Sequence, residues 1–333
     1  MRPRTSILFI TLVIVLVSLF ILDLAVGTVY VSPREVWNAL TGGECPTNTA
    51  KIILNIRLIK AVVAVLAGAA LSVSGLQMQT LFRNPLAGPY VLGISSGASL
   101  GVAIFILGAP LFGITASFAS LGIAGAAWVG ASLVLILIAL VGNHIKDIMV
   151  ILILGMMFSS GVSAVVQILQ YLSRDESLKS FVIWTMGSLG DVTISQLYIL
   201  IPAIVAGMVL AVFTIKPLNL LLFGEDYAVT MGLNIKNSRA LIFISTTLLA
   251  GTITAFCGPI GFIGLAIPHV TRMLFDNRDH RILIPGTVLA GASIMLVCDL
   301  ISKIFVLPVN AITALLGIPV VVWIVFKNKS VAA

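Results

Sequence analysis

A search of the sequence for catalytic residues finds few groupings whose types and spacing fit a reaction. There is no GxxxxGK phosphate loop, no HExxH zinc motif and no pair of carboxylates at helical spacing. Gly93, Ser95 and Gly97 match the G-x-S-x-G pattern of hydrolases, but that pattern needs a strand-to-helix turn beside a histidine. Here the three residues lie in a run of small residues typical of packed helices. We therefore predict that Ser95 packs rather than serving an intramembrane hydrolase, and that the chain is not an enzyme.

Residue types that commonly bind metals are scattered along the chain. His144, His269 and His280 fall at predicted helix ends without the spacing of a metal site, and we expect them to be satisfied boundary residues. The three cysteines show no CxxC spacing, and two of them lie in apolar runs. We predict no metal site, no disulfide framework and no cofactor bound by this chain.

Asp299 is the one carboxylate that we identify inside an otherwise apolar run, and an acid within a membrane commonly has a function. Lys303 follows it by four residues and so shares its helical face. We favour a structural ion pair near the outer surface over a proton relay. A proton relay would fit an ion-gradient-driven secondary transporter. We keep this function as an alternative, although only Asp299 and the Gly/Pro-broken segment 258–268 favour it.

The composition places the chain in a membrane. Charged residues make up 9% of the 333 residues and the mean hydropathy is +1.18, whereas about a quarter of a soluble domain is charged. Residues 84–145 contain no Asp, Glu, Lys or Arg, so they must cross hydrocarbon as more than one helix. The net charge of +7 comes from single basic residues in short loops. This pattern fits membrane orientation, and we predict no nucleic-acid binding.

Apolar runs bounded by charges or by Gly and Pro predict an all-α, polytopic membrane protein with one transmembrane domain over residues 1–333. We expect about ten transmembrane helices, near 6–26, 61–82, 88–107, 114–141, 148–171, 194–215, 239–256, 260–271, 283–302 and 310–326. The first run lacks a convincing cleavage site, so we interpret it as a helix rather than a signal peptide. Basic residues are more frequent in the loops on the N-terminal side, which predicts that both termini are cytosolic.

Small residues repeat at intervals of four within two neighbouring spans. Gly97 and Gly101 form one such pair, and Gly122, Ala126 and Gly130 follow in the next span. The spacing predicts closely packed helices.

The most informative segment outside the spans is 216–239. Gly232 predicts a break between two short helices, Glu225 and Asp226 are suited to the start of one, and Lys236 and Arg239 start the next span. The segment is unusually apolar for a solvated connector, which favours a docking surface for a cytosolic partner.

Five long motifs follow one another along the chain. They are GLQMQTLFRNPLAGPYVLGISSGASLG at 75–101, WTMGSLGD at 184–191, FGEDYAVTMGLNIKNSR at 223–239, GPIGFIGLAIPHVTR at 258–272 and TALLGIPVVVW at 313–323. In this order they resemble the FecCD-type permease subunits of ATP-binding-cassette (ABC) importers for iron-siderophores, haem and cobalamin. The resemblance implies a permease of the cell inner (plasma) membrane that moves a metal chelate into the cytoplasm by alternating access.

The resemblance also implies partners. We expect a homodimer of ten-helix subunits in the lipid bilayer with the translocation path at the dimer interface. Two ABC ATPase subunits that use ATP and Mg would bind the cytosolic face, and a substrate-binding protein would bind outside.

Site residues are implied in the same way. ATPase coupling is implied for Phe223, Gly224, Glu225, Asp226, Ala228, Met231, Gly232 and Arg239. Docking of the binding protein is implied for Arg57, Lys60 and Lys303, and the cytosolic gate for Asn84, Leu86, Asp147, Ile148 and Met149. The sequence departs from the family at RLIK (57–60), where Arg-Leu-Pro-Arg is usual, and at VLPVN (306–310), where Glu-Leu-Pro-x-Gly is common. We expect these departures to alter docking geometry and partner choice.

Overall fold

The computed structural model describes residues 3–27, 31–108, 120–142, 145 and 147–329. This part of the chain consists of helices and connecting turns, with no β-strand. In chain order the elements are α1 (Pro3–Ala25), α2 (Pro33–Thr41), α3 (Thr47–Ile52), η1 (Ile53–Arg57), α4 (Leu58–Leu81), α5 (Ile94–Ala103), η2 (Ile104–Gly108), α6 (Ser120–Gly142), α7 (Ile148–Leu172), α8 (Asp175–Thr185), α9 (Ile194–Phe213), α10 (Ile215–Leu221), α11 (Glu225–Thr230), α12 (Ile235–Thr246), η4 (Thr247–Gly251), α13 (Thr252–Cys257), α14 (Ile263–Phe275), α15 (His280–Phe305) and α16 (Val309–Lys329).

Six helical runs are long and apolar enough to cross a membrane. They are Arg4–Ala25, Thr47–Leu81, Ile148–Leu172, Ile194–Phe213, Ile235–Cys257 and His280–Phe305. Shorter apolar helices accompany them at Ile94–Gly108, Gly122–Ile138, Ile263–Phe275 and Val309–Trp323. Each predicted span overlaps one of these runs, and the all-helical membrane fold is confirmed.

Two predicted span boundaries are wrong. The span expected from residue 88 begins at Ile94, because Pro89 and Gly93, whose φ is +78°, belong to a turn rather than a helix. The span expected near 61–82 belongs to a helical run of 35 residues that begins at Thr47 and passes through the π-helical segment η1. The start of the predicted span 114–141 lies outside the described residues.

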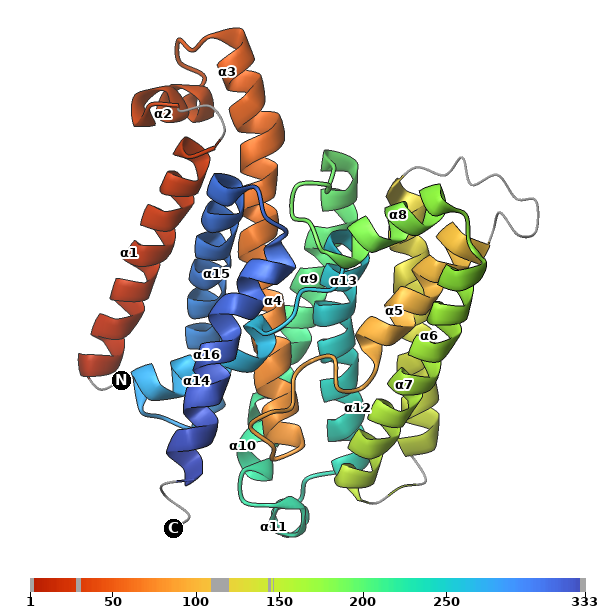
Figure 1. Ribbon diagram of the computed structural model, residues 1–333. Coiled ribbons are helices and arrows are strands. Elements are labelled where there is room, and N and C mark those ends of the chain that lie inside the picture. Colours follow the sequence, from red (N-terminus) through yellow and green to blue (C-terminus); the bar gives the residue numbers. More distant parts are fainter. Residues whose placement is uncertain (1–2, 28–30, 109–119, 143–144, 146, 330–333) are drawn as a thin grey trace.

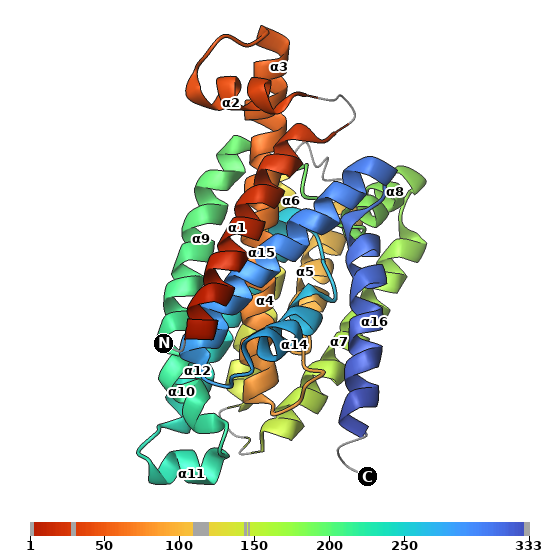
Figure 2. The same ribbon diagram turned by 90° about the vertical axis from the view of Figure 1, so that its left-hand side faces the viewer.

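The helix α4 occupies the centre of the fold and packs against α1, α14 and α15 (Figures 1 and 2). Glycines allow the close approaches. A Cβ at Gly75 would collide with the carbonyl of Gly264 on α14, and one at Gly68 would collide with the carbonyl of Gly291 on α15. Only a residue without a side chain fits at such a backbone contact.

The helices α5 and α6 form a second closely packed pair. A Cβ at Gly97 would lie 2.6 Å from the carbonyl oxygen of Gly130, and one at Gly101 would collide with the carbonyl of Ala126. The prediction that these small residues pack helices together is therefore confirmed.

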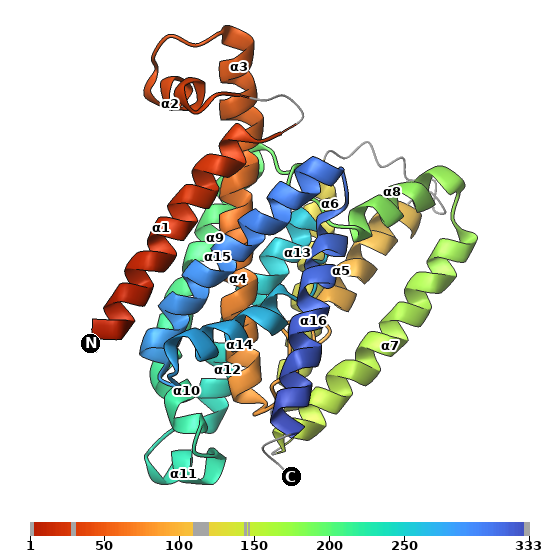
Figure 3. The ribbon, with the colours of Figure 1, turned by 60° about the vertical axis from the view of Figure 1, so that its left-hand side comes forward.

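Short helices outside the long apolar runs gather at the two ends of the helical bundle. The helices α2, α3 and α8 lie at one end, and α11 lies at the other (Figures 1 and 3). The first helix begins and the last helix ends toward the α11 end. These two ends contain the residues for which the sequence predicts partner contacts.

Candidate functional site

The segment 216–239 folds as two short helices, α10 and α11, before α12 begins. Gly224, with φ of +106°, precedes α11, and Gly232, with φ of +83°, follows it. Glycine suits these left-handed positions because it has no Cβ. Glu225 and Asp226 occupy the first turn of α11, where carboxylates interact favourably with the helix dipole. The helix start at Glu225 and a break at Gly232 are confirmed, but Gly232 separates α11 from α12, whereas the two short helices are separated at Gly224.

A bidentate ion pair ties α11 to α12. Arg239 Nη2 donates to both oxygens of the Glu225 carboxylate, at 2.6 Å to Oε1 and 2.7 Å to Oε2. Arg239 Nη1 also donates to the carbonyl of Ile145 at 3.4 Å. Ala228 of α11 is fully buried, and together with these contacts it holds the helix in one orientation.

Four large apolar side chains project from this segment. Phe223, Tyr227, Val229 and Met231 are each at least half exposed, and Phe223 is 70% exposed. The rings of Phe223 and Tyr227 lie 5.5 Å apart. We call these four residues the apolar ridge. Among the residues predicted for ATPase coupling, Phe223, Asp226 and Met231 are exposed, whereas Glu225, Ala228 and Arg239 make contacts inside the segment.

At the opposite end, four charged side chains from three helices form a cluster. Lys60 Nζ lies 2.9 Å from Asp299 Oδ1, and Lys303 Nζ lies 2.9 Å from Asp299 Oδ2. Lys303 Nζ also lies 2.7 Å from Asp23 Oδ2 and donates to the Asp23 carbonyl at 3.1 Å. The predicted pair of Asp299 and Lys303 is confirmed. We call Asp23, Lys60, Asp299 and Lys303 the outer ionic cluster.

Our sequence interpretation that Asp299 is the one carboxylate in an apolar run is wrong, because Asp23 is a second. Asp23 lies in the last turns of α1 and is fully buried. Its position inside the first apolar run was the sequence feature that could have identified it as a buried carboxylate. A buried carboxylate needs a cation, and the sequence does not show that Lys303 supplies it.

Arg57 binds backbone carbonyls at the C-terminal end of α1. Its Nη1 donates to the carbonyls of both Leu24 and Ala25 at 2.8 Å, and Gly27 lies against the guanidinium. Lys303 Nζ donates to the preceding carbonyl, that of Asp23. Carbonyls of the last helical turn have no partner within the helix, so Arg57 and Lys303 together cap the C-terminus of α1.

An open pocket of about 520 Å³ lies beside this cap. Its wall contains Arg57, Lys60 and Lys303, the three residues predicted to dock a binding protein. Among the apolar lining residues, Val306 is 80% exposed and holds a φ of +53°, which is strained for a β-branched side chain. Lys60, with a side chain 20% exposed, is more open than Lys303 at 9%.

The residues predicted for the cytosolic gate lie in two turns. Asn84 Oδ1 accepts from the backbone of Leu86, and Asp147 Oδ1 accepts from the backbone of Met149, both at 2.9 Å. Asp147 thereby caps α7, and Ile148 is its first residue. Leu86 and Met149 are each 45% exposed. The helix α4 ends and α7 begins toward the α11 end (Figure 1).

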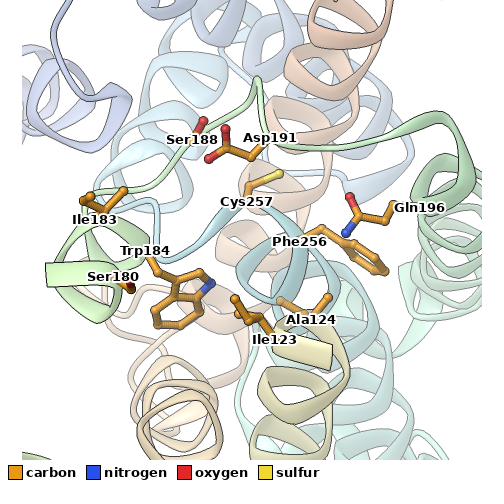
Figure 4. Close-up of a pocket in the computed structure, with 11 residues that line it drawn as sticks. Ile123, Ala124, Ser180, Ile183, Trp184, Ser188, Asp191, Gln196, Phe256 and Cys257 are labelled. Carbon is orange, nitrogen blue, oxygen red and sulfur yellow. The ribbon is translucent and has the colours of Figure 1, made fainter. Parts of the chain in front are cut away.

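A further pocket, of about 180 Å³, lies where α8 and the start of α9 meet α6 and α13 (Figure 4). Asp191, Ser188 and Gln196 supply polar atoms, and Phe256 supplies an apolar wall. The indole Nε1 of Trp184 is buried and has no hydrogen-bond partner in the described part of the chain.

The residues that matched catalytic or metal-binding patterns in the sequence make ordinary structural contacts. Ser95 lies in the first turn of α5 after a turn, not after a strand. His269 contacts the Pro85 carbonyl at 2.7 Å and His280 contacts Thr80 Oγ1 at 2.9 Å, as expected of satisfied boundary histidines; His144 lies outside the described residues. Within the described ranges, no group of three or more His, Cys, Asp or Glu is arranged to hold a metal ion.

Comparison with known proteins agrees with the motifs. The profile of the FecCD transport family matches residues 13–327. The chain is 34% identical to the hemin transport system permease protein of Yersinia pestis, with 98% of this chain and 97% of that protein covered. It is 36% identical to the vitamin B12 import system permease protein of Klebsiella pneumoniae, with 96% and 93% covered.

A solved structure resembles the fold along nearly the whole chain. It is described as an inward-facing conformation of a metal-chelate type ABC transporter, and it superposes with a TM-score of 0.85 at 29% identity. The match covers 97% of this chain and 99% of the solved one. Because the family profile and these relatives extend over almost all of its length, the chain belongs to the FecCD transport family.

Proposed function

We propose that this chain is the membrane-spanning permease subunit of an ABC importer that moves a metal chelate into the cytoplasm by alternating access. The observation that carries the proposal is the almost end-to-end similarity to permeases named for hemin and for vitamin B12. The cargo class is therefore haem, cobalamin or an iron-siderophore. The chain has no catalytic role of its own, and a separate subunit hydrolyses ATP.

The architecture that we propose has about ten membrane spans and two cytosolic termini, in the cell inner (plasma) membrane. Two copies form a homodimer around the translocation path. Two ABC ATPases, which use ATP and Mg, bind at the α11 end, and a substrate-binding protein binds at the opposite end. The helix α1 begins and the helix α16 ends toward the α11 end (Figure 1), which fits this orientation.

The apolar ridge is the proposed ATPase contact. Exposed Phe, Tyr, Val and Met side chains on the short helix α11 and directly beside its two ends are suited to a hydrophobic groove on a partner. Asp226 adds an exposed carboxylate beside it. Glu225, Ala228, Arg239 and the two glycines hold the shape that presents these side chains.

For the outer end, we propose that the binding protein contacts Lys60 first. Three basic residues, Arg57, Lys60 and Lys303, face two acidic ones, Asp23 and Asp299, so the site has one net positive charge. Arg57 and Lys303 already hold the carbonyls of α1. One carboxylate per subunit on the partner would balance the remaining charge and guide association.

The two turns of Asn84, Leu86, Asp147, Ile148 and Met149 are proposed as the cytosolic gate. Their support is that α4 ends and α7 begins toward the α11 end (Figure 1), and that Leu86 and Met149 are exposed. Apolar side chains at a constriction can close a path by excluding water.

The test is ATPase activity and uptake by this chain reconstituted with its ATPase and binding-protein partners. Haem, a ferric siderophore and cobalamin are added in turn. Stimulation by one loaded binding protein supports the importer and identifies its cargo. If no ATPase subunit associates and uptake follows an ion gradient without ATP, the secondary transporter replaces it. The position of Asp299 between two lysines does not favour that alternative.

A further inference from the structure

A polar hub joins the coupling segment to two membrane helices. Asn219, on α10, donates through Nδ2 to Asp279 Oδ1 at 2.7 Å. Its Oδ1 accepts from the backbone of His280 at 2.9 Å and lies 2.7 Å from His280 Nδ1. On the other side of the imidazole, Nε2 lies 2.9 Å from Thr80 Oγ1 on α4. Asn219 therefore connects α10 with the start of α15 and, through His280, with α4.

The orientation of the groups in this hub follows from their chemistry. A carboxylate only accepts hydrogen bonds, so the Asn219 amide must turn its nitrogen toward Asp279 and its oxygen toward His280. The oxygen then requires a proton on His280 Nδ1. In the neutral imidazole, Nε2 is left as an acceptor, so the one proton of the Thr80 hydroxyl must turn to Nε2 rather than to the Leu76 carbonyl, which lies 3.0 Å away. Every member of the chain from Asp279 to Thr80 thus has a partner of the right kind.

Burial makes these bonds costly to break. His280 is 1% exposed and Thr80 is 4% exposed. A buried polar group that loses its partner bears the full cost of desolvation. A shift of α10 must therefore move the start of α15 with it or leave buried groups unpaired.

The hub is placed between the apolar ridge and the membrane helices. The helix α10 ends at Leu221, two residues before the first ridge residue, Phe223, and its Leu218 and Leu221 are buried. The other tie of this segment, the pair of Glu225 and Arg239, leads to α12. The hub instead leads to α15, which carries Asp299 and Lys303 of the outer ionic cluster near its far end.

We propose that Asn219 is a positioning residue that transmits movement of the coupling segment to α15 and α4. This inference rests on the proposed function, because it assumes that an ATPase acts on the apolar ridge. Apolar contacts between α10 and the bundle permit sliding, whereas the directional bonds of Asn219 impose one register. In this proposal the hub acts through the helix ends that it holds.

The experiment uses the complete transporter in vesicles and compares ATP hydrolysis with cargo uptake for Asn219→Ala. The matched control is Asn237→Ala, an exposed asparagine in the same segment. We expect the variant to assemble and to hydrolyse ATP within about twofold of the wild type, while uptake per ATP falls about tenfold, the effect of one to two lost hydrogen bonds. The control should retain the wild-type ratio.

A second pair of variants keeps the test valid if Asn219→Ala fails to assemble. Thr80→Val removes the hydroxyl at nearly constant shape, and Thr80→Ser retains it. Lower uptake per ATP in Thr80→Val with recovery in Thr80→Ser supports the hub. An unchanged ratio in Asn219→Ala, or a parallel fall of hydrolysis, uptake and thermal stability, would overturn the proposal. Failure of the wild-type chain to bind an ATPase would instead contradict the proposed function.

Discussion

Lys303 on α15 and Asp23 on α1 form a 2.7 Å ion pair, although 280 residues separate them in the sequence. The same lysine pairs with Asp299 one helical turn away. One ammonium therefore neutralises parts of two buried carboxylates and fixes the end of the first helix against α15. The relationship makes Lys303 a structural residue, whatever it contributes to partner binding.

Replacing Lys303 by Met should strongly destabilise the protein. Asp23 would lose its cation and Asp299 would keep only Lys60, and breaking a buried ion pair typically costs about 3–5 kcal/mol. Thermal unfolding in detergent measures the effect, and the control is Lys179→Met, at an exposed lysine of α8. Equal melting temperatures for the two variants would show that the outer ionic cluster is not structural.

Arg57 and Lys60 should have separable roles. Arg57→Ala removes two charge-assisted bonds to the end of α1, and we expect a loss of about 1.5–3 kcal/mol of stability. Lys60→Ala should change stability less and reduce the rate of binding-protein association in a salt-dependent way. Unfolding curves and association kinetics at two salt concentrations distinguish the roles. Reduced association for Arg57→Ala at unchanged stability would favour direct docking by Arg57 instead.

The two acids at the start of α11 should differ as well. Glu225→Lys places a cation against Arg239, so α11 should detach from α12, and both stability and ATPase binding should fall. Asp226→Lys alters an exposed charge and should weaken ATPase binding alone. Co-purification of the ATPase subunit and thermal unfolding check both. The swap Glu225→Lys with Arg239→Glu should recover part of the lost stability; no recovery would mean that this pair does not hold α11.

Gly75→Ala should disrupt the contact of α4 with α14, because its Cβ would collide with the Gly264 carbonyl. Overpacking of this kind typically costs about 1–3 kcal/mol. Gly125→Ala on α6 is the matched control, since its Cβ would meet no atom within 4 Å. Unfolding in detergent should separate the two variants, and equal stability would contradict the close approach of the two backbones.

Acid should weaken the start of α15 through Asp279. Burial raises the pKa of this carboxyl, but bonds from the Arg281 backbone and from Asn219, together with nearby positive charge, bring the pKa below its ordinary value of 3.8. A lowered pKa stabilises the folded state above pH 3.8, and this stability is lost as the pH falls through the folded-state pKa. Melting temperatures of Asp279→Asn should therefore fall less with acid than those of the wild type. Exposed Asp276→Asn is the control, and equal slopes for all three would contradict the prediction.

Local patterns in the sequence determined the membrane class, the apolar runs, the break at Gly232 and the pairing of Asp299 with Lys303. Each depends on residues within one or two helical turns, where helical periodicity alone states which side chains share a face. The small residues of α5 and α6 belong here too, because four-residue spacing on neighbouring spans implies a close helix pair. The family resemblance rested on equally local motifs.

Only the tertiary structure decided what the charged residues near the helix ends contact. The sequence shows Arg57, Lys60 and Lys303 as three similar outer cations, but packing assigns Arg57 and Lys303 to the end of α1 and leaves Lys60 the more exposed. Asp23 pairs with Lys303, and Asn219 contacts His280, although long stretches of chain separate the partners. Such contacts depend on which helices the core brings side by side, and no periodicity along one helix contains that information.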